Sequence, residues 1–460
     1  MHRRRKSLPA LPALLAAVTL ATTACQGLHG EEPKLSRGHQ WIRSHPFWIS
    51  ALTQNGKLYE VDEYRTAGLN TLLAWDPRPL LFQKSVDASF PIHYHIHQNH
   101  GETVEDYVQH VRQLVQKYPG CTGLLFYDEP RVPAMTKVRD VCQALRGAFP
   151  HMLVYSNAMP KGAIRPAKYG FGADAPSDFY AAYIEQFARV VQGDVLMLDI
   201  YPLGQGGGHS RVYFETLTLA RQWGLRTGVP YWVIIQAYDH GGQKRRPSES
   251  DLRFQLFTPL AYGFTGISYF TYDPALGPGL IDGNRKRTPL YYHAGRANLE
   301  VAHLGRTLRF LTSTGIAFVL GRHTADGKSV ENEMPPMPPP GPWVWRDVKR
   351  RPRQLKDVHV AGRGQGHDAL LGFFEDDQGD AYLMVTNLWH EKQMSAAECA
   401  QTVTLSFTPD VKQVTRLARE TGEPEMLVVH NGSLRLRLPG GTGDLFKLGS
   451  GSFPGLPDRK

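Results

Sequence analysis

Residues 124–130 read LLFYDEP, an apolar run that ends on a tyrosine, two carboxylates and a proline. The run is the fourth of eight short apolar segments between residues 42 and 272, and helical patterns fill most of the gaps. Eight parallel strands that alternate with helices close into a (β/α)8 barrel, whose chemistry lies at the C-terminal strand ends. The stretch therefore predicts both a fold and the place of a site within it.

The eight predicted strands are short and several are apolar throughout, as strands buried on both faces should be. They are residues 47–51, 72–75, 92–97, 123–127, 152–156, 195–199, 231–236 and 266–271. Between them, residues 104–118 and 179–190 carry apolar side chains at the 3.6-residue helical period. Ser248 and Asp251 form a capping-box pattern at the start of another helix. We expect the barrel to cover residues 41–314, because eight repeats favour closure over an open doubly wound sheet.

Beyond residue 315 the pattern changes to short strands without intervening helices. The predicted strands are residues 315–320, 370–374, 382–386, 402–407, 414–417, 426–429, 434–438 and 445–448. Strands at this spacing are typical of an antiparallel sandwich, which we expect over residues 315–460. The proline-rich stretch 334–342 and the basic stretch 349–353 predict a long exposed loop within that domain.

The N-terminus has the pattern of a secretion signal rather than of a folded segment. Four basic residues at 3–6 precede an apolar stretch from Leu8 to Leu20, and small residues lead up to Cys25. We expect residues 1–24 to be removed, Cys25 to be lipidated and residues 25–40 to form a tether. Plain secretion is the alternative. In either case the mature chain is expected outside the cytoplasm, bound to a membrane only through that anchor.

Composition and cysteine content narrow the function further. The formal charge of +9 falls to +5 when the four basic residues of the signal are removed, so we expect no nucleic-acid partner. Cys121 opens the fourth strand and Cys142 lies late in the following helix. In an oxidising compartment these two predict a disulfide, and Cys399 is left over.

Glycosidic cleavage requires one carboxylic acid to protonate the leaving oxygen and a second carboxylate across the sugar ring. Glu129, at the end of the fourth strand, is the predicted general acid. Asp199 ends the sixth strand and is the predicted nucleophile or water-activating base; Asp128 is the alternative, or orients Glu129. The competing interpretation is that residues 128–130 only start the next helix and that Asp199 binds loop amides.

Further polar and aromatic residues stand at the predicted strand ends. Aromatic faces stack on the C–H surfaces of sugars, and amides hydrogen-bond their hydroxyls. The predicted substrate-binding residues are Trp75, Asp76, His97, Tyr127, Asn157, Tyr201, Gln236, Tyr238 and Tyr272.

Alternating histidines in the third strand offer a second chemistry. His93, His95 and His97 share one strand face, as metal ligands in barrel hydrolases do. The fifth and sixth strands contain no histidine to complete such a set. We therefore expect a polar lining or sugar contacts, with no metal and no cofactor, and keep a metal-dependent hydrolase as an alternative.

Four stretches of the chain resemble bacterial glycoside hydrolase-like barrel proteins related to clan A and to family 42 β-galactosidases. They are residues 124–130, 198–202 (LDIYP), 252–255 and 260–270 (LAYGFTGISYF). The resemblance implies that Glu129 is the acid/base glutamate of the fourth strand. Those enzymes place asparagine before it, where this chain has Asp128, and a nucleophilic glutamate at the end of the seventh strand, where this chain has Gln236. Glutamine is not a carboxylate nucleophile, so the second role falls to Asp199 or Asp128.

The sequence supports three hypotheses about the function. The leading one is a glycoside hydrolase that cleaves an extracytoplasmic polysaccharide or oligosaccharide with carboxylate acid/base catalysis. Gln236 motivates the first alternative, a carbohydrate-binding lipoprotein whose hydrolase barrel is degenerate. The strand-three histidines motivate the second alternative, the metal-dependent hydrolase.

Overall fold

The first eight strands of the chain run parallel and close into a barrel in sequence order. They are β1 (Trp48–Thr53), β2 (Thr71–Trp75), β3 (Ile92–His95), β4 (Cys121–Asp128), β5 (Leu153–Ala158), β6 (Leu196–Ile200), β7 (Tyr231–Gln236) and β8 (Gly266–Phe270). The computed structural model describes residues 35–76, 78–162, 165–206, 208–210, 212–321, 344–349, 351–360 and 366–457. Closure is complete because β1 pairs with both β2 and β8, which confirms the predicted barrel.

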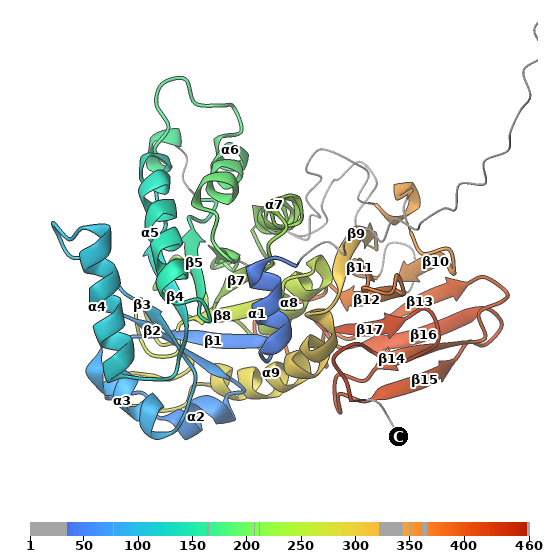
Figure 1. Ribbon diagram of the computed structural model, residues 1–460. Helices are drawn as coiled ribbons and strands as arrows, with labels where there is room; N and C mark the ends of the chain where they lie inside the picture. Colours follow the sequence, from blue (N-terminus) through green and yellow to red (C-terminus); the bar gives the residue numbers. More distant parts are fainter. Residues whose placement is uncertain are drawn as a thin grey trace, which may run out of the picture. The chain divides into compact units, whose positions relative to one another are not determined.

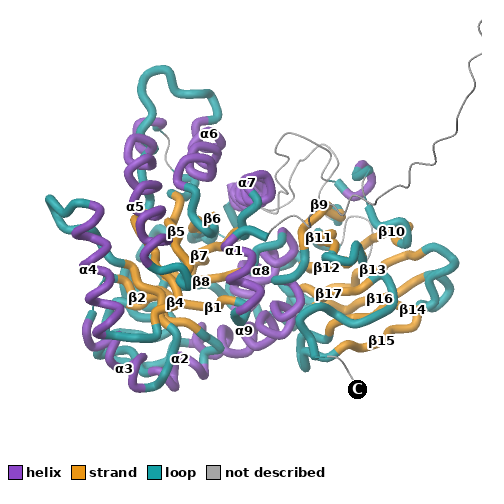
Figure 2. Tube along the Cα trace, in the orientation of Figure 1, coloured by secondary structure: helices purple, strands orange, loops and turns teal. Residues whose placement is uncertain are grey.

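Helices follow the strands and cover the outside of the barrel (Figures 1 and 2). They are α2 (Val61–Thr66), α3 (Pro79–Asp87), α4 (Val104–Lys117), α5 (Met135–Ala148), α6 (Phe179–Gln186), α7 (Val212–Thr227), α8 (Glu249–Tyr262) and α9 (Pro289–Leu308). The capping box predicted at Ser248 and Asp251 starts α8. No helix within the described residues is long and apolar enough to cross a membrane.

An additional helix, α1 (Arg37–Ser44), precedes the barrel. It begins inside the tether that the sequence predicts for residues 25–40, because Trp41 and Ile42 find an apolar surface at the base of the barrel to bury against. Signal residues 1–24 and the lipidation candidate Cys25 lie outside the described residues.

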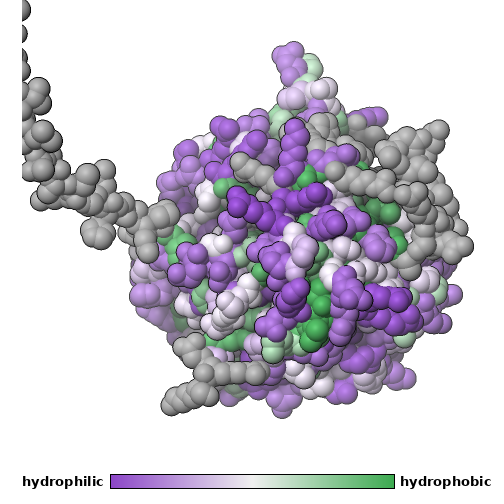
Figure 3. Space-filling view, turned by 90° about the vertical axis from the view of Figure 1, so that its right-hand side faces the viewer, coloured by the Kyte–Doolittle hydropathy of each residue, from purple (hydrophilic) through white to green (hydrophobic). Residues whose placement is uncertain are grey.

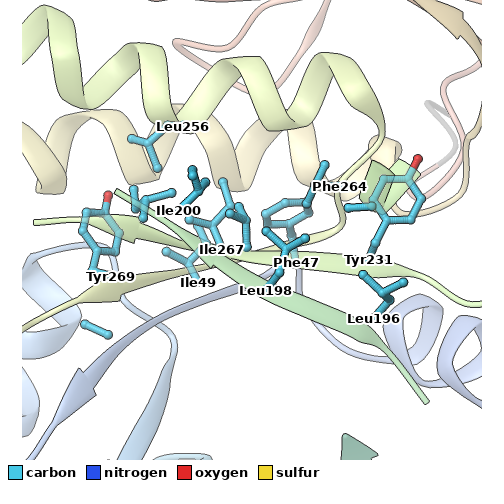
Figure 4. Packing of buried hydrophobic residues seen from close by; sticks show 14 of the residues in the cluster. Phe47, Ile49, Leu196, Leu198, Ile200, Tyr231, Leu256, Phe264, Ile267 and Tyr269 are labelled. Atoms are coloured by element: carbon cyan, nitrogen blue, oxygen red, sulfur yellow. The ribbon is translucent and has the colours of Figure 1, made fainter. Parts of the chain in front are cut away.

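Alternation along each strand produces two separate apolar layers. Outward side chains such as Ile49, Leu198 and Ile267 pack beneath the helices (Figure 4). Inward side chains form a second cluster inside the barrel, where Trp48 stacks on Trp232 with ring centroids 4.2 Å apart. These large rings need small neighbours. A Cβ at Gly266 would lie 2.6 Å from the Trp232 ring, and one at Gly123 would lie 2.6 Å from His93.

The C-terminal strands form two antiparallel sheets that face each other across one apolar core. They are β9 (Thr312–Val319), β10 (Leu355–Val360), β11 (Ala369–Glu375), β12 (Ala381–Asn387), β13 (Gln401–Phe407), β14 (Gln413–Leu417), β15 (Pro424–Val428), β16 (Ser433–Leu438) and β17 (Gly443–Lys447). Among the described residues, β10-β13-β16 make one sheet and β15-β14-β17-β12-β11-β9 the other. The predicted sandwich is confirmed, except that the sequence analysis missed β10, which follows the basic stretch 349–353. The predicted loop 334–342 lies outside the described residues.

The surface over these sheets is mostly hydrophilic, with scattered small apolar patches (Figure 3). The apolar side chains that remain exposed on this domain include Met426 and Val428 of β15. Single exposed apolar residues of this kind are ordinary and indicate no partner.

A buried polar network joins the barrel to the sandwich. Arg245, before α8, binds the Asp251 carboxylate through two guanidinium nitrogens, and His390 Nδ1 lies 2.7 Å from Asp251 Oδ1. All three side chains are almost fully buried. Burial opposes ionisation of Asp251, but the bonds from Arg245 and His390 outweigh it and hold the pKa of this carboxyl well below its ordinary value.

Replacing Asp251 by asparagine is expected to destabilise the chain strongly. The change leaves the buried Arg245 without its counter-charge, a loss that typically lowers the free energy of unfolding by about 3–5 kcal/mol. Denaturant titration of both proteins measures the difference. Asp140→Asn, exposed on α5, is the control and should change stability by less than about 1 kcal/mol. A similar small change for Asp251→Asn would contradict the role of the network.

The predicted disulfide is not formed. Cys121, Cys142 and Cys399 are all free and buried. Cys121 lies at the first residue of β4 and donates from Sγ to the Gly123 carbonyl oxygen, 3.3 Å away. Cys142 lies six residues before the end of α5, about 9 Å up the helix from the base of the barrel. The helix therefore carries the second thiol away from the level of the first.

Candidate active site

The end of β4 is irregular. Tyr127 and Glu129 have φ angles of 65° and 52°, in the left-handed region that non-glycine residues seldom adopt. Two bonds to β5 hold this conformation: Ser156 Oγ donates to the Tyr127 carbonyl oxygen at 2.6 Å, and the Glu129 amide donates to the Asn157 carbonyl oxygen at 2.9 Å. Strain of this kind persists only where the surroundings impose it, and it is common at active sites.

Asn157 of β5 connects the carboxylates of the two neighbouring strands. Its Nδ2 donates to Asp128 Oδ1 at 3.0 Å and to Asp199 Oδ1 at 3.1 Å. The barrel register pairs Asp128 with Asn157, and β6 ends at Ile200, directly after Asp199. The structure therefore brings together Asp128, Glu129, Asn157 and Asp199, all of which the sequence places at strand ends.

These carboxyls hold protons more tightly than ordinary ones. Burial, followed by repulsion from Asp128, raises the pKa of Glu129 to about 7, although Lys168 opposes the shift. Burial, then Glu129 and Asp128, raise the pKa of Asp199 well above its ordinary value. Burial also raises the pKa of Asp128. Three acids in mutual reach do not all ionise near neutral pH, so the cluster retains a proton.

The three acids differ in the hydrogen-bond donors that reach them. Asp199 accepts from Asn157 and from the Tyr201 side chain, and both bonds favour its ionised form. Asp128 also accepts from Asn157. Within the described residues, the Glu129 carboxylate accepts no hydrogen bond. Burial and the neighbouring acids outweigh those bonds, so the pKa of Asp199 is raised together with that of Glu129, and the retained proton belongs to the coupled pair.

An aromatic wall stands beside the acids. The rings of Tyr201, Tyr238 and Phe270 meet with centroids 5.3–5.4 Å apart. The sequence analysis identified the two tyrosines and missed Phe270. The two-residue period of a strand could have identified it. Gly266 and Ser268 of the predicted eighth strand face inward, so Phe270 is expected to face inward as well. The Tyr127 ring, at the end of β4, is 41% exposed.

A second group occupies the ends of β2 and β3. Trp75 stacks on His95 with centroids 3.9 Å apart, and His97 Nε2 lies 2.9 Å from Asp76 Oδ1. Burial, followed by His97, lowers the pKa of His95 to about 3, so this ring is neutral. Trp75, Asp76 and His97 were predicted as substrate-binding residues, whereas His95 was predicted as polar lining or a sugar contact.

Two predicted substrate-binding residues serve the fold instead. Gln236 is fully buried: its Oε1 accepts from the Leu203 amide at 2.9 Å, and its Nε2 donates to the carbonyls of Leu203 and Arg245. The Gln236 side-chain amide thus joins the loops at Leu203 and Arg245, and these bonds occupy the groups that a sugar hydroxyl would need. Tyr272 is also fully buried and packs against Tyr64, with centroids 5.0 Å apart.

The path of the chain after β8 explains the position of Tyr272. The Tyr272 amide donates to the Leu52 carbonyl oxygen, and the Asp273 carboxylate accepts from the amides of Gln54 and Asn55. These bonds draw the chain across β1 and away from the mouth of the barrel. Asp273 is therefore a loop residue.

No family model matches the chain, and no curated protein matches it in sequence. Among solved structures it is similar to an α-L-arabinofuranosidase from Thermotoga maritima in complex with arabinose. The TM-score is 0.44 and the identity 9%, over 88% of this chain and 97% of that one. A thermostable GH51 α-L-arabinofuranosidase from Thermotoga petrophila gives a TM-score of 0.44 at 10% identity, over 90% and 97% of the two chains.

A third similar structure is a β-galactosidase from the psychrophilic Marinomonas ef1. Its TM-score is 0.41 at 11% identity, over 57% of this chain and 62% of that one. The narrower resemblance to family 42 stays a prediction, because no family model supports it.

Proposed function

We propose that this chain is a glycoside hydrolase in which Glu129 is the general acid and Asp199 the second carboxylate. The observation that carries the proposal is the pairing at the barrel mouth. Glu129, whose pKa is raised to about 7, and Asp199, which accepts hydrogen bonds from Asn157 and Tyr201, are coupled electrostatically and together retain a proton. A pair of acids that shares one proton supplies both the protonated acid and the carboxylate that catalysis on a glycoside requires.

In the proposed reaction, Glu129 protonates the leaving oxygen as the glycosidic bond breaks. Asp199, held by Asn157 and Tyr201, either attacks the anomeric carbon or removes a proton from the attacking water. The wall of Tyr201, Tyr238 and Phe270 offers a flat apolar surface for the sugar ring. Asp128 raises the pKa of Glu129 by repulsion, and so helps it to keep its proton.

The test is a screen of the purified chain against polysaccharides and aryl glycosides, with product analysis by chromatography. Proton NMR of the first product then assigns retention or inversion, which distinguishes a nucleophilic Asp199 from a water-activating one. Release of sugar by the wild type and its loss in Glu129→Gln support the proposal. Binding of a glycan with no turnover would instead support the alternative below.

The alternative is a carbohydrate-binding protein without catalysis, and Gln236 favours it. The strand end that holds the nucleophile in related barrels carries an amide here, and that amide is consumed by backbone bonds of the loops. In that case Glu129→Gln should leave glycan affinity unchanged, as isothermal titration would measure.

We also propose that the chain acts outside the cytoplasm, anchored through a lipid on Cys25. The signal-like pattern of residues 1–24 supports this. Membrane fractionation of cells that express the wild type or Cys25→Ala tests it. The anchored form should sediment with membranes, and the variant should not.

The pH dependence of the reaction follows from the Glu129 proton. Since the acid must be protonated, kcat/KM should fall as pH rises through about 7, the pKa to which burial and Asp128 raise Glu129. The apparent value belongs to the coupled carboxyls together. Initial rates between pH 4 and 9 on a substrate with a poor leaving group measure it. A rate that stays constant to pH 9 would contradict the assignment.

A further inference from the structure

Three potential metal ligands converge at the ends of β2 and β3. Asp76 directly follows β2, His95 ends β3, and His97 lies two residues further on. One ligand atom from each lies within 4.8 Å of the others, and within the described residues no other set of histidine, cysteine or acidic groups meets that criterion. The register between β2 and β3 brings these side chains together, because it pairs Trp75, the residue before Asp76, with His95.

His95 supplies an independent indication of a ligand. Its ring is buried, and neither Nδ1 nor Nε2 has a hydrogen-bond partner among the described residues. Buried polar atoms are nearly always satisfied, by protein, by water or by a bound ion. Trp75 covers one face of the ring, which leaves its edge directed toward Asp76 and His97.

The remaining histidine of the strand is excluded from this group. His93 lies deeper in the barrel, where its Nδ1 is 2.8 Å from the Tyr155 hydroxyl and its ring stacks on Trp48. Asp76, in contrast, has a φ of 65°, a conformation that a non-glycine residue keeps only where its surroundings impose it.

We propose that Asp76, His95 and His97 bind one divalent transition-metal ion of the Zn²⁺ class. Two imidazoles and one carboxylate suit such ions, whereas Mg²⁺ and Ca²⁺ prefer oxygen ligands alone. Metal–ligand distances of about 2.0–2.2 Å require the set to close by roughly an ångström. His97 makes this closure possible, because 60% of its side chain is exposed.

Three protein ligands leave at least one coordination position for water or a substrate oxygen. His97 is in electrostatic reach of Asp128, so the open position would be beside the acid cluster. The inference does not rest on the proposed hydrolysis, since metal binding is measured without turnover.

The experiment uses the full chain, purified without an affinity tag and stripped with a chelator. Titration with Co²⁺, followed by its visible absorption, and with Zn²⁺, followed by calorimetry, should each show one equivalent bound. His97→Ala and Asp76→Asn should weaken that binding by about 100-fold or more. Circular dichroism confirms that both variants fold, which is expected because neither side chain is buried.

His100→Ala is the matched control, since His100 is exposed three residues further along the same loop. It should bind like the wild type. Absence of one stoichiometric equivalent in the wild type overturns the site. So does equal affinity in His97→Ala and the wild type, which would assign the binding to other surface histidines.

Discussion

Replacing Glu129 by glutamine is expected to lower kcat/KM on an unactivated glycoside by about 10²–10⁴-fold, the usual contribution of a general acid. Glutamine keeps the volume of the side chain but has no acidic proton for the leaving oxygen. A dinitrophenyl glycoside, whose leaving group needs no proton, should lose far less activity. Steady-state rates on the two substrates measure this difference, and equal losses on both would contradict the role of general acid.

Stability measurements separate this loss from misfolding. The folded chain keeps the Glu129 proton to about pH 7, whereas an ordinary glutamate in the unfolded chain releases it near 4.5. The unfolded state therefore binds fewer protons in this window, and the free energy of unfolding falls as pH rises from about 4.5 to 7. Glu129→Gln should escape that penalty and melt at or above the wild-type temperature at pH 8. Asp174→Asn, an exposed carboxylate after β5, should change neither property.

Replacing Asp199 by asparagine should reduce turnover further, by about 10⁴-fold, on the activated substrate as well as on the natural one. An amide neither attacks the anomeric carbon nor accepts a proton from water, so a good leaving group brings no relief. Rates on the same two substrates measure the loss. Strong loss on both substrates distinguishes Asp199 from Glu129, whose loss depends on the leaving group.

The same variant tests the coupling between the two carboxyls. Repulsion between Glu129 and Asp199 acts on both, so removing the Asp199 charge should lower the pKa of Glu129. The basic limb of the residual activity should then move to lower pH. Full activity in Asp199→Asn would exclude it as the second carboxylate and leave Asp128 for that role.

Much of the candidate site was predictable because strand periodicity is local. Glu129, Asn157 and Asp199 follow apolar runs, and parallel strands in a barrel present their C-terminal ends on one face. Phe270 was within reach of the same reasoning. The capping box at Ser248 was predictable for a similar reason, since its bonds span only three residues.

Side chains beyond the strand ends were not predictable in this way. Gln236 faces inward by period, yet its amide binds the backbone of loops at Leu203 and Arg245. Tyr272 lies away from the mouth of the barrel because the Asp273 carboxylate binds the amides of Gln54 and Asn55, more than 200 positions earlier in the chain. The meeting of Asp76 with His95 depends on the register between β2 and β3, and the separation of Cys121 from Cys142 depends on where α5 packs.

By itself, the amino-acid sequence determined the order of strands and helices, the closure of the barrel, the sandwich that follows and the strand ends at which acids stand. Hydrophobic period and turn residues specify these features over a few positions. Only the tertiary structure decided which side chains share protons, which ones fasten loops and which histidine is buried without a partner. Those outcomes depend on bonds and desolvation between segments far apart in the chain, about which local periodicity carries no information.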